Sequence, residues 1–194
     1  MKNKGLIITI IVIVLAAIWG ISAYNGLVKA EVDVDKQWAN VESQYQRRAD
    51  LIDNLVATVK GYATHEKETF ENVVNARAKA TQIQVNADNL TPAKMQEFQA
   101  AQGELSSALG KLLMVVENYP DLKANQNFLE LQAQLEGTEN RIQVERMRYN
   151  EIAGTFNKAI RIFPKSVIAS LAGFERKPFF EADETAKTAP KVQF

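Results

Sequence analysis

The first sixty residues constrain the fold most, because an uninterrupted apolar run leads directly into a heptad pattern. Residues 6–23 are apolar except for Thr9, Gly20 and Ser22. As one helix, a run of this length can cross the hydrocarbon core of a bilayer, which is about 30 Å thick. The sequence therefore predicts a short basic N-terminus at residues 1–5 and a transmembrane helix at residues 6–23.

The residues that flank this run bear on its orientation and on its retention. Lys2 and Lys4 precede the run, and the basic residues after it are diluted by acidic ones, which favours a cytoplasmic N-terminus and an extracytoplasmic body. Ser22 and Ala23 resemble a signal-peptide processing site, so cleavage is an alternative. The run is longer than a typical signal-peptide core, however, and Trp19 lies where an interfacial aromatic residue anchors a retained helix. A retained signal-anchor is therefore the preferred interpretation.

Heptad-spaced apolar residues continue through the body and predict four amphipathic helices with coiled-coil-like seams. They are expected at about residues 27–60, 64–87, 91–116 and 127–163. Thr91-Pro92 predicts a helix start, Asn127 with Glu130 a start of the capping-box type, and Pro164 a stop. Short connections are typical of up-and-down bundles. We therefore predict an all-α fold in which residues 24–173 form an antiparallel up-and-down four-helix bundle with long helices.

The region after Pro164 shows a weaker pattern. Residues 167–171 predict a short apolar helix that ends at Gly173. Residues 174–194 are mixed in charge and have no period, so they are expected to form a loosely ordered tail whose Phe179-Phe180 pair docks locally.

Composition excludes several functional classes. The chain has 23 basic and 23 acidic residues without long blocks of either sign, so neither nucleic acid nor an acidic membrane surface is implied as a partner. Cysteine is absent, which removes thiolate metal sites and cysteine nucleophiles. His65, the single histidine, lacks the second histidine of a helical zinc motif, and no serine-nucleophile elbow or glycine-rich nucleotide loop occurs. We therefore expect no catalytic residue, metal, cofactor or small-molecule substrate.

Charged residues at seam positions are the candidates for a functional or structural network. Glu31, Arg48, Glu66, Arg77 and Glu145 stand where apolar residues are expected. A charge that faces a core must be paired, so Arg48, Arg77 and Glu145 are predicted to form a buried network that links three helices. Fixing the helix register is the preferred role. The alternatives are side chains that reach solvent at the bundle edge and, ranked last, a hydrolase built on Glu66 and Glu145.

The extreme C-terminus could dock a partner. Val192 and Phe194 place an apolar residue two positions before a terminal aromatic carboxylate, an ending that strand-adding domains capture. The alternative is that the tail packs on the bundle.

The order of several short motifs resembles that of the bacterial LemA family. The motifs are Tyr24-Asn25, Leu27-Val28, Arg47-Arg48-Ala49-Asp50-Leu51-Ile52, Val59-Lys60-Gly61-Tyr62, Tyr119-Pro120-Asp121-Leu122-Lys123-Ala124, Tyr149-Asn150 and Phe163-Pro164. The resemblance covers residues 6–163. It implies an N-terminally anchored helical bundle in the inner membrane of the bacterial cell envelope, and it supplies no catalytic residues. The family often has proline where this chain has Asp53, and without proline the first helix can continue unkinked.

Two functional hypotheses follow. The first is a non-enzymatic, membrane-tethered scaffold that contacts lipid through its N-terminal helix and self-associates as a homo-oligomer. Ala16 and Gly20 form a small-residue pair with the spacing that lets transmembrane helices approach each other. The second is an adaptor that presents a client, or its own C-terminus, to an envelope protease as its protein partner.

Overall fold

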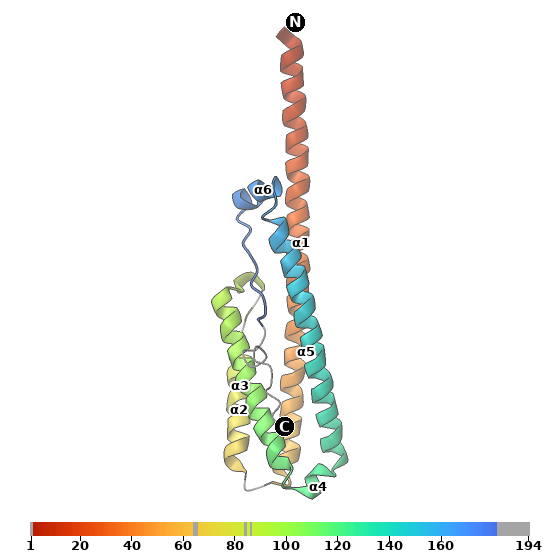
Figure 1. The fold of residues 1–194 in the computed structure, drawn as a ribbon, viewed down its shortest axis with the longest axis vertical. Coiled ribbons are helices and arrows are strands. Elements are labelled where there is room, and N and C mark those ends of the chain that lie inside the picture. The colour runs from red at the N-terminus through yellow and green to blue at the C-terminus, as the bar shows by residue number, and fades with distance from the viewer. Residues whose placement is uncertain (1, 64–65, 84, 86, 182–194) are drawn as a thin grey trace, which may run out of the picture.

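Every regular element in the described part of the chain is a helix (Figure 1). The computed structural model describes residues 2–63, 66–83, 85 and 87–181. The elements are α1 (Lys2–Lys60), α2 (Lys67–Gln82), the short 3-10 helix η1 (Ala87–Asn89), α3 (Pro92–Val116), α4 (Pro120–Lys123), α5 (Gln126–Ala159) and α6 (Lys165–Ala172). The predicted all-α class is confirmed.

Helix α1 is a single helix of 59 residues that joins the apolar run to the body. Residues 24–60 contain no proline, and position 53 is Asp in this chain. The backbone hydrogen bonds of the helix therefore continue without interruption to Lys60. The large apolar side chains between Leu6 and Ile18 are 49% to 65% exposed. This end of α1 extends beyond the rest of the protein (Figure 1). Within the described residues, α1 is the one helix that is long and apolar enough to cross a membrane.

The other helices pack chiefly as two antiparallel pairs. α5 packs along α1, and α2 packs along α3, with the α2–α3 pair beside the half of α1 that is farther from the N-terminus (Figure 1). The chain therefore alternates in direction through α1, α2, α3 and α5. Because the contacts are concentrated within these two pairs, the finer prediction of four-helix-bundle packing with coiled-coil seams stays a prediction.

Two apolar clusters form the core. The cluster far from the N-terminus contains buried side chains from each neighbouring helix, including Leu55, Phe70, Leu105, Leu122 and Phe128. Burying a side chain of this size contributes about 1.5–3 kcal/mol. The second cluster surrounds Trp38 and lies nearer the apolar end of α1. These clusters hold the α2–α3 pair against the α1–α5 pair.

Helix α2 is shorter than predicted and α3 is as predicted. α3 begins at Pro92, and the Thr91 hydroxyl accepts a hydrogen bond from the Lys94 backbone N–H at 3.2 Å. The prediction of residues 64–87 for α2 was wrong at its C-terminal end, since the helix stops at Gln82. The early stop has a consequence in the core, because it frees the Val85 carbonyl to accept the Trp38 indole N–H at 2.7 Å.

The start and end of α5 also differ from the prediction. The N-cap is Asn125 rather than Asn127, since the Asn125 side chain accepts the backbone N–H of Phe128 at 3.1 Å. The helix ends at Ala159, before the predicted Pro164, because residues 160–164 form the turn into α6. The predicted stop at Gly173 is confirmed: this glycine has φ 76°, a left-handed conformation that lacks a steric penalty only for glycine.

Residues 174–181, which we call the C-terminal strap, pack on α5 instead of forming a loose tail. Asn157 pairs with the Lys177 backbone, donating to its carbonyl at 2.8 Å and accepting from its N–H at 2.9 Å. Asn150 makes the same two bonds with the Phe180 backbone, both at 2.9 Å. Phe180 is 5% exposed, so the predicted docking is confirmed for this residue. The prediction of a loosely ordered tail was therefore wrong for the strap, and residues 182–194 lie outside the described residues.

Candidate functional site

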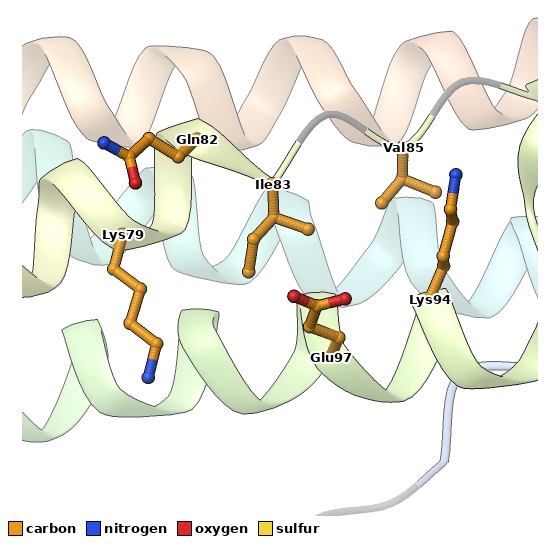
Figure 2. Close-up of a pocket in the computed structure, with 6 residues that line it drawn as sticks. All are labelled: Lys79, Gln82, Ile83, Val85, Lys94 and Glu97. Atoms are coloured by element: carbon orange, nitrogen blue, oxygen red, sulfur yellow. The ribbon is translucent and has the colours of Figure 1, made fainter.

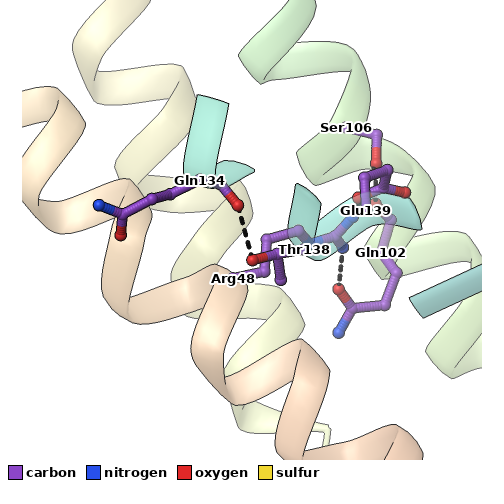
Figure 3. A network of polar contacts seen from close by, with 6 residues as sticks. All are labelled: Arg48, Gln102, Ser106, Gln134, Thr138 and Glu139. Atoms are coloured by element: carbon purple, nitrogen blue, oxygen red, sulfur yellow. Dashed lines mark hydrogen bonds and ion pairs between the residues drawn. The ribbon is translucent and has the colours of Figure 1, made fainter. Parts of the chain in front are cut away.

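Among the charged side chains that the structure describes, Arg48 on α1 is the most buried, with an exposed fraction of 2%. Its guanidinium lies among Gln102 and Ser106 of α3 and Glu139 of α5 (Figure 3). Nη1 donates to Glu139 Oε2 at 2.8 Å and to Ser106 Oγ at 3.2 Å, and Nη2 donates to Gln102 Oε1. We call Arg48, Gln102, Ser106, Thr138 and Glu139 the Arg48 cluster.

The Arg48 cluster connects four helices. Arg48 links α1 to α3 and α5, and the Gln102 amide reaches the Ala80 carbonyl of α2 at 3.5 Å. Thr138, 2% exposed, donates its hydroxyl to the Gln134 carbonyl at 2.7 Å and so needs no partner from another helix (Figure 3). The guanidinium also lies 5.1 Å from the centre of the Tyr45 ring, within the range of a cation–π contact.

The chemical groups of the Arg48 cluster are suited to holding helices in position rather than to catalysis. Arginine stays protonated at any physiological pH and cannot act as a general base. Glu139, the one carboxylate of the cluster, has a side chain that is 44% exposed and already paired with Arg48. A hydroxyl with no adjacent base is not activated as a nucleophile. The cluster can therefore fix how the helices pack, and its groups match no hydrolytic arrangement.

The predicted network of Arg48, Arg77 and Glu145 is wrong in its connections. Arg77 of α2 donates to Asp53 Oδ2 at 2.5 Å and to the Ala49 carbonyl at 3.1 Å, both on α1. Glu145 accepts hydrogen bonds from Gln37 and Arg148, and the carboxylate that pairs with Arg48 is that of Glu139. The three residues thus belong to three separate clusters along the body.

Glu145 of α5 has a side chain that is 16% exposed and faces α1. Its carboxylate accepts from Gln37 Nε2 at 2.6 Å and from Arg148 Nη1 at 2.7 Å. Glu145 follows Glu139 by six residues, about 9 Å farther along the helix axis. Because of this offset, the Glu145 side chain lies beside Gln37 of α1 and not beside Arg48.

The remaining charged candidates lie apart from one another. Glu66 precedes α2 and accepts the Tyr119 hydroxyl at 3.1 Å, near the end of the body that is farthest from the N-terminus. It does not join Glu145, as the hydrolase hypothesis would require. His65, Val192 and Phe194 lie outside the described residues. The docking hypothesis for the C-terminus therefore stays a prediction.

Glu31 connects to the C-terminal strap. Its carboxylate lies 2.9 Å from Lys177 Nζ, whose side chain is 14% exposed, and Asp35 lies 3.8 Å from the same ammonium. Nearby, burial and the negative charge of Asp35 raise the pKa of the Tyr149 phenol well above its usual value. The Tyr149 hydroxyl donates to the Pro178 carbonyl at 3.1 Å, so the strap is held by a neutral phenol as well as by an ion pair.

An aromatic cluster around Trp38 completes this region, and the sequence did not reveal it. The Trp38 ring stacks on Phe180 at 5.8 Å and meets Phe98 and Tyr149 edge-on, both at 5.6 Å. Trp38 and Phe98 are apolar residues of the heptad pattern, and both are buried. The strap that covers them has no periodic pattern, and the one signal for it was the spacing of Asn150 and Asn157, two helical turns apart on α5.

A surface pocket lies between the end of α2 and the start of α3 (Figure 2). It has a volume of about 350 Å³ and is lined by Lys79, Gln82, Ile83, Val85, Lys94 and Glu97. Glu97 points toward Ile83, and Lys79 extends toward α3, where its ammonium pairs with Glu104 at 2.8 Å (Figure 2). The pocket combines two ammonium groups with one carboxylate and one amide, without a nucleophile–base pair. Across the described ranges, no group of three His, Cys, Asp or Glu residues could hold a metal ion.

Comparison with known proteins gives one family match and several relatives. A family model described as the LemA family matches residues 37–194. The magnetosome protein MamQ of Magnetospirillum gryphiswaldense is 25% identical over 191 residues, which cover 87% of this chain and 70% of the relative. Magnetosome protein MamQ 2 of Paramagnetospirillum magneticum is 25% identical over 85% of this chain and 67% of the relative. Protein LemA of Metamycoplasma hominis is 25% identical over 82% of this chain and 69% of the relative.

Proposed function

The chain belongs to the LemA family, and on this premise we propose that it is a non-enzymatic helical scaffold, tethered to the inner membrane of the bacterial envelope by α1. The family and its MamQ and LemA relatives support membrane association. The N-terminus lies in the cytoplasm in this proposal, and the body lies on the other side of the membrane. Self-association as a homo-oligomer, and contact with another envelope protein, are further parts of the proposal.

One observation carries the membrane-tethered part: the apolar end of α1 is exposed along its whole length while the same helix continues into the core. The large apolar side chains from Leu6 to Ile18 stay exposed next to the described part of the body, whereas Leu27 and Val34 on the same helix are 1% exposed. A contiguous apolar surface of this size is characteristic of a membrane-contacting or protein-contacting surface. Because the run matches the thickness of a hydrocarbon core, lipid is the environment we propose.

Contacts between α1 and α6 support retention of the N-terminal segment. A Cβ atom at Gly20 would lie 3.8 Å from Ile168 Cδ1 of α6, and Ala23 is 5% exposed. The ring of Tyr24 lies 5.9 Å from that of Phe174. A mature chain that began near Tyr24 would lose Gly20 and, with it, the part of α1 that lies beside Ile168 of α6.

These contacts also bear on self-association. Gly20 belongs to the small-residue pair that could bring two anchors together, and Ile168 of the same chain already lies beside it. We therefore place any contact between anchors on another face of α1.

The scaffold part is supported by the clusters between helices. The polar groups buried around Arg48 bind helix to helix and match no catalytic arrangement, and an ion pair fixes the strap to α1. In this proposal, these polar contacts keep the helices in one arrangement, so that the body presents a fixed surface to a protein partner.

Two measurements test membrane anchoring and self-association separately, and the first concerns membrane anchoring. The full chain, expressed in a bacterial host, is washed with alkaline carbonate, and the intact mass of the membrane fraction is measured. We expect the protein to stay with the membranes at the full mass of 21.7 kDa. Release into the wash, or a mass that lacks residues 1–23, would refute the tether.

Sedimentation of the detergent-solubilised chain over a range of concentrations then tests the oligomer. We expect a species larger than the monomer, and a monomer at every concentration would refute self-association alone.

A further inference from the structure

Helix α6 and the turn before it form the end of the body nearest to the free part of α1 (Figure 1). We call residues 161–172 the α6 platform. On its inner side, Ala169 is 2% exposed and Ile168 contacts Gly20 of α1. The platform is thus fixed to the anchor helix itself, at a defined level.

The outer side of the platform carries large apolar side chains that nothing in the described part of the chain covers. Phe163 is 78% exposed, Val167 is 49% exposed and Leu171 is 82% exposed. Val167 and Leu171 are spaced by four and lie on one face of α6, and Phe163 lies in the turn that precedes the helix. We call these three exposed side chains the apolar stripe, and an apolar surface of this kind needs an apolar partner.

The level of the platform identifies that partner. Gly20, which Ile168 contacts, lies three residues inside the apolar run that ends at Ala23, or about 5 Å along the helix axis. If residues 6–23 fill the hydrocarbon core, α6 therefore lies just at its edge. Helices that bind at the membrane interface bury their apolar face about 5–10 Å into the boundary between headgroups and acyl chains.

The charges around the platform fit the same environment. Lys158, Arg161, Lys165 and Arg176 are exposed, and Glu175 is the one acidic residue in residues 158–176. No ion pair is found for these four basic side chains among the described residues. Basic side chains at this level are attracted to anionic lipid headgroups. The balanced total of 23 basic and 23 acidic residues concealed this local excess.

We propose that the α6 platform is a second membrane-binding element, which lies in the interface of the bilayer that α1 spans, with Phe163, Val167 and Leu171 among the acyl chains. The inference rests on the proposed membrane anchor, because the bilayer is located by α1. It differs from the anchor in kind, since α6 lies on the membrane rather than across it. A stripe that instead bound a second copy of the chain would be shielded from both lipid and water.

Site-directed spin labelling tests the platform, because the chain contains no cysteine and a single introduced cysteine gives one label. The full chain carrying Leu171→Cys is reconstituted into vesicles of phosphatidylcholine and phosphatidylglycerol. Collision rates of the label are then measured with oxygen, which concentrates in lipid, and with a nickel chelate, which stays in water. Met114→Cys is the matched control, because Met114 is 66% exposed in the last turn of α3, and α3 lies beside the half of α1 that is farther from the N-terminus (Figure 1).

We expect an oxygen-to-nickel collision ratio several times higher at position 171 than at position 114. Equal ratios at the two positions would overturn the platform, and so would a label at position 171 that neither reagent reaches. Ile13→Cys, at a 61% exposed position of α1, separates the two proposals. A lipid-exposed label at position 13 with a water-exposed one at position 171 refutes the platform alone, whereas water-exposed labels at both refute the anchor too. Circular dichroism of each labelled protein must match that of the parent.

Discussion

Replacing Arg48 by methionine tests the central polar cluster most directly. The change keeps an unbranched apolar stem and removes the donors that Gln102 and Glu139 accept from. Gln102 is only 9% exposed, so water cannot replace the lost bond to its carbonyl oxygen. The Glu139 side chain is 44% exposed and can turn to water instead. The energetic cost therefore falls on Gln102 rather than on the carboxylate.

The magnitude follows from these two environments. An unsatisfied buried acceptor costs about 1–3 kcal/mol, and loss of the cation–π contact with Tyr45 adds about 0.5–1 kcal/mol. The half-exposed ion pair with Glu139 contributes little. We expect Arg48→Met to lower the free energy of unfolding by about 1.5–4 kcal/mol. A second change, Gln102→Leu, removes the unpaired acceptor and should recover most of this loss, because both partners are then apolar.

The assay is urea unfolding of the full chain in a mild detergent, followed by far-ultraviolet circular dichroism. Arg47→Met is the matched control: Arg47 is the exposed neighbour of Arg48, and we expect its replacement to change stability by less than about 0.5 kcal/mol. Glu145→Gln is the second control. The reasoning is refuted if Arg48→Met equals the parent in stability, or if Glu145→Gln rather than Gln102→Leu restores it.

Three other predictions concern α5 and the segments it holds. Asn125→Ala should destabilise the protein by about 1 kcal/mol through loss of the helix cap, and Asn127→Ala by much less; thermal unfolding of the two variants compares them. The Tyr149 phenol stays neutral in the folded protein but ionises above about pH 10 once unfolded, so the free energy of unfolding should fall as the pH rises beyond that value. Tyr149→Phe should show a weaker fall than the parent, and an unchanged alkaline profile would contradict the assignment. Asn150→Ala removes both bonds to the Phe180 backbone and should accelerate amide hydrogen exchange at Phe180, while exchange at the core of α1 stays as slow as in the parent.

Elements with strong local signals were predicted well from the sequence. Thr91 and Pro92 define a helix start through side-chain chemistry and a fixed φ angle, and Gly173 defines a stop through its left-handed conformation. Both signals act within a few residues, so they do not depend on the rest of the fold. The continuity of α1 through Asp53 has the same origin, since the absence of proline is a local property.

The partners of the buried charges could not be predicted in the same way. Heptad spacing places Arg48 and Glu145 on inward faces, but it does not give the axial offset between α1 and α5. That offset decides whether Arg48 meets Glu139 or Glu145, and it depends on the whole packed surface of both helices. The sequence indicated local docking of the Phe179-Phe180 pair but not the course of the strap, because the strap bonds to Asn150 and Asn157 through its own backbone and has no periodic pattern in its side chains.

Because α1 is one uninterrupted helix, a change in the orientation of its apolar end also reorients its other end. In the proposed arrangement, residues 24–60 continue the membrane-spanning segment for about 55 Å without a joint. A change of about 10° in the tilt of the spanning segment would swing the far end of the body sideways by about 10 Å. Tilt responds to bilayer thickness, so lipid composition at one end of the helix would set the position of the loops at the other.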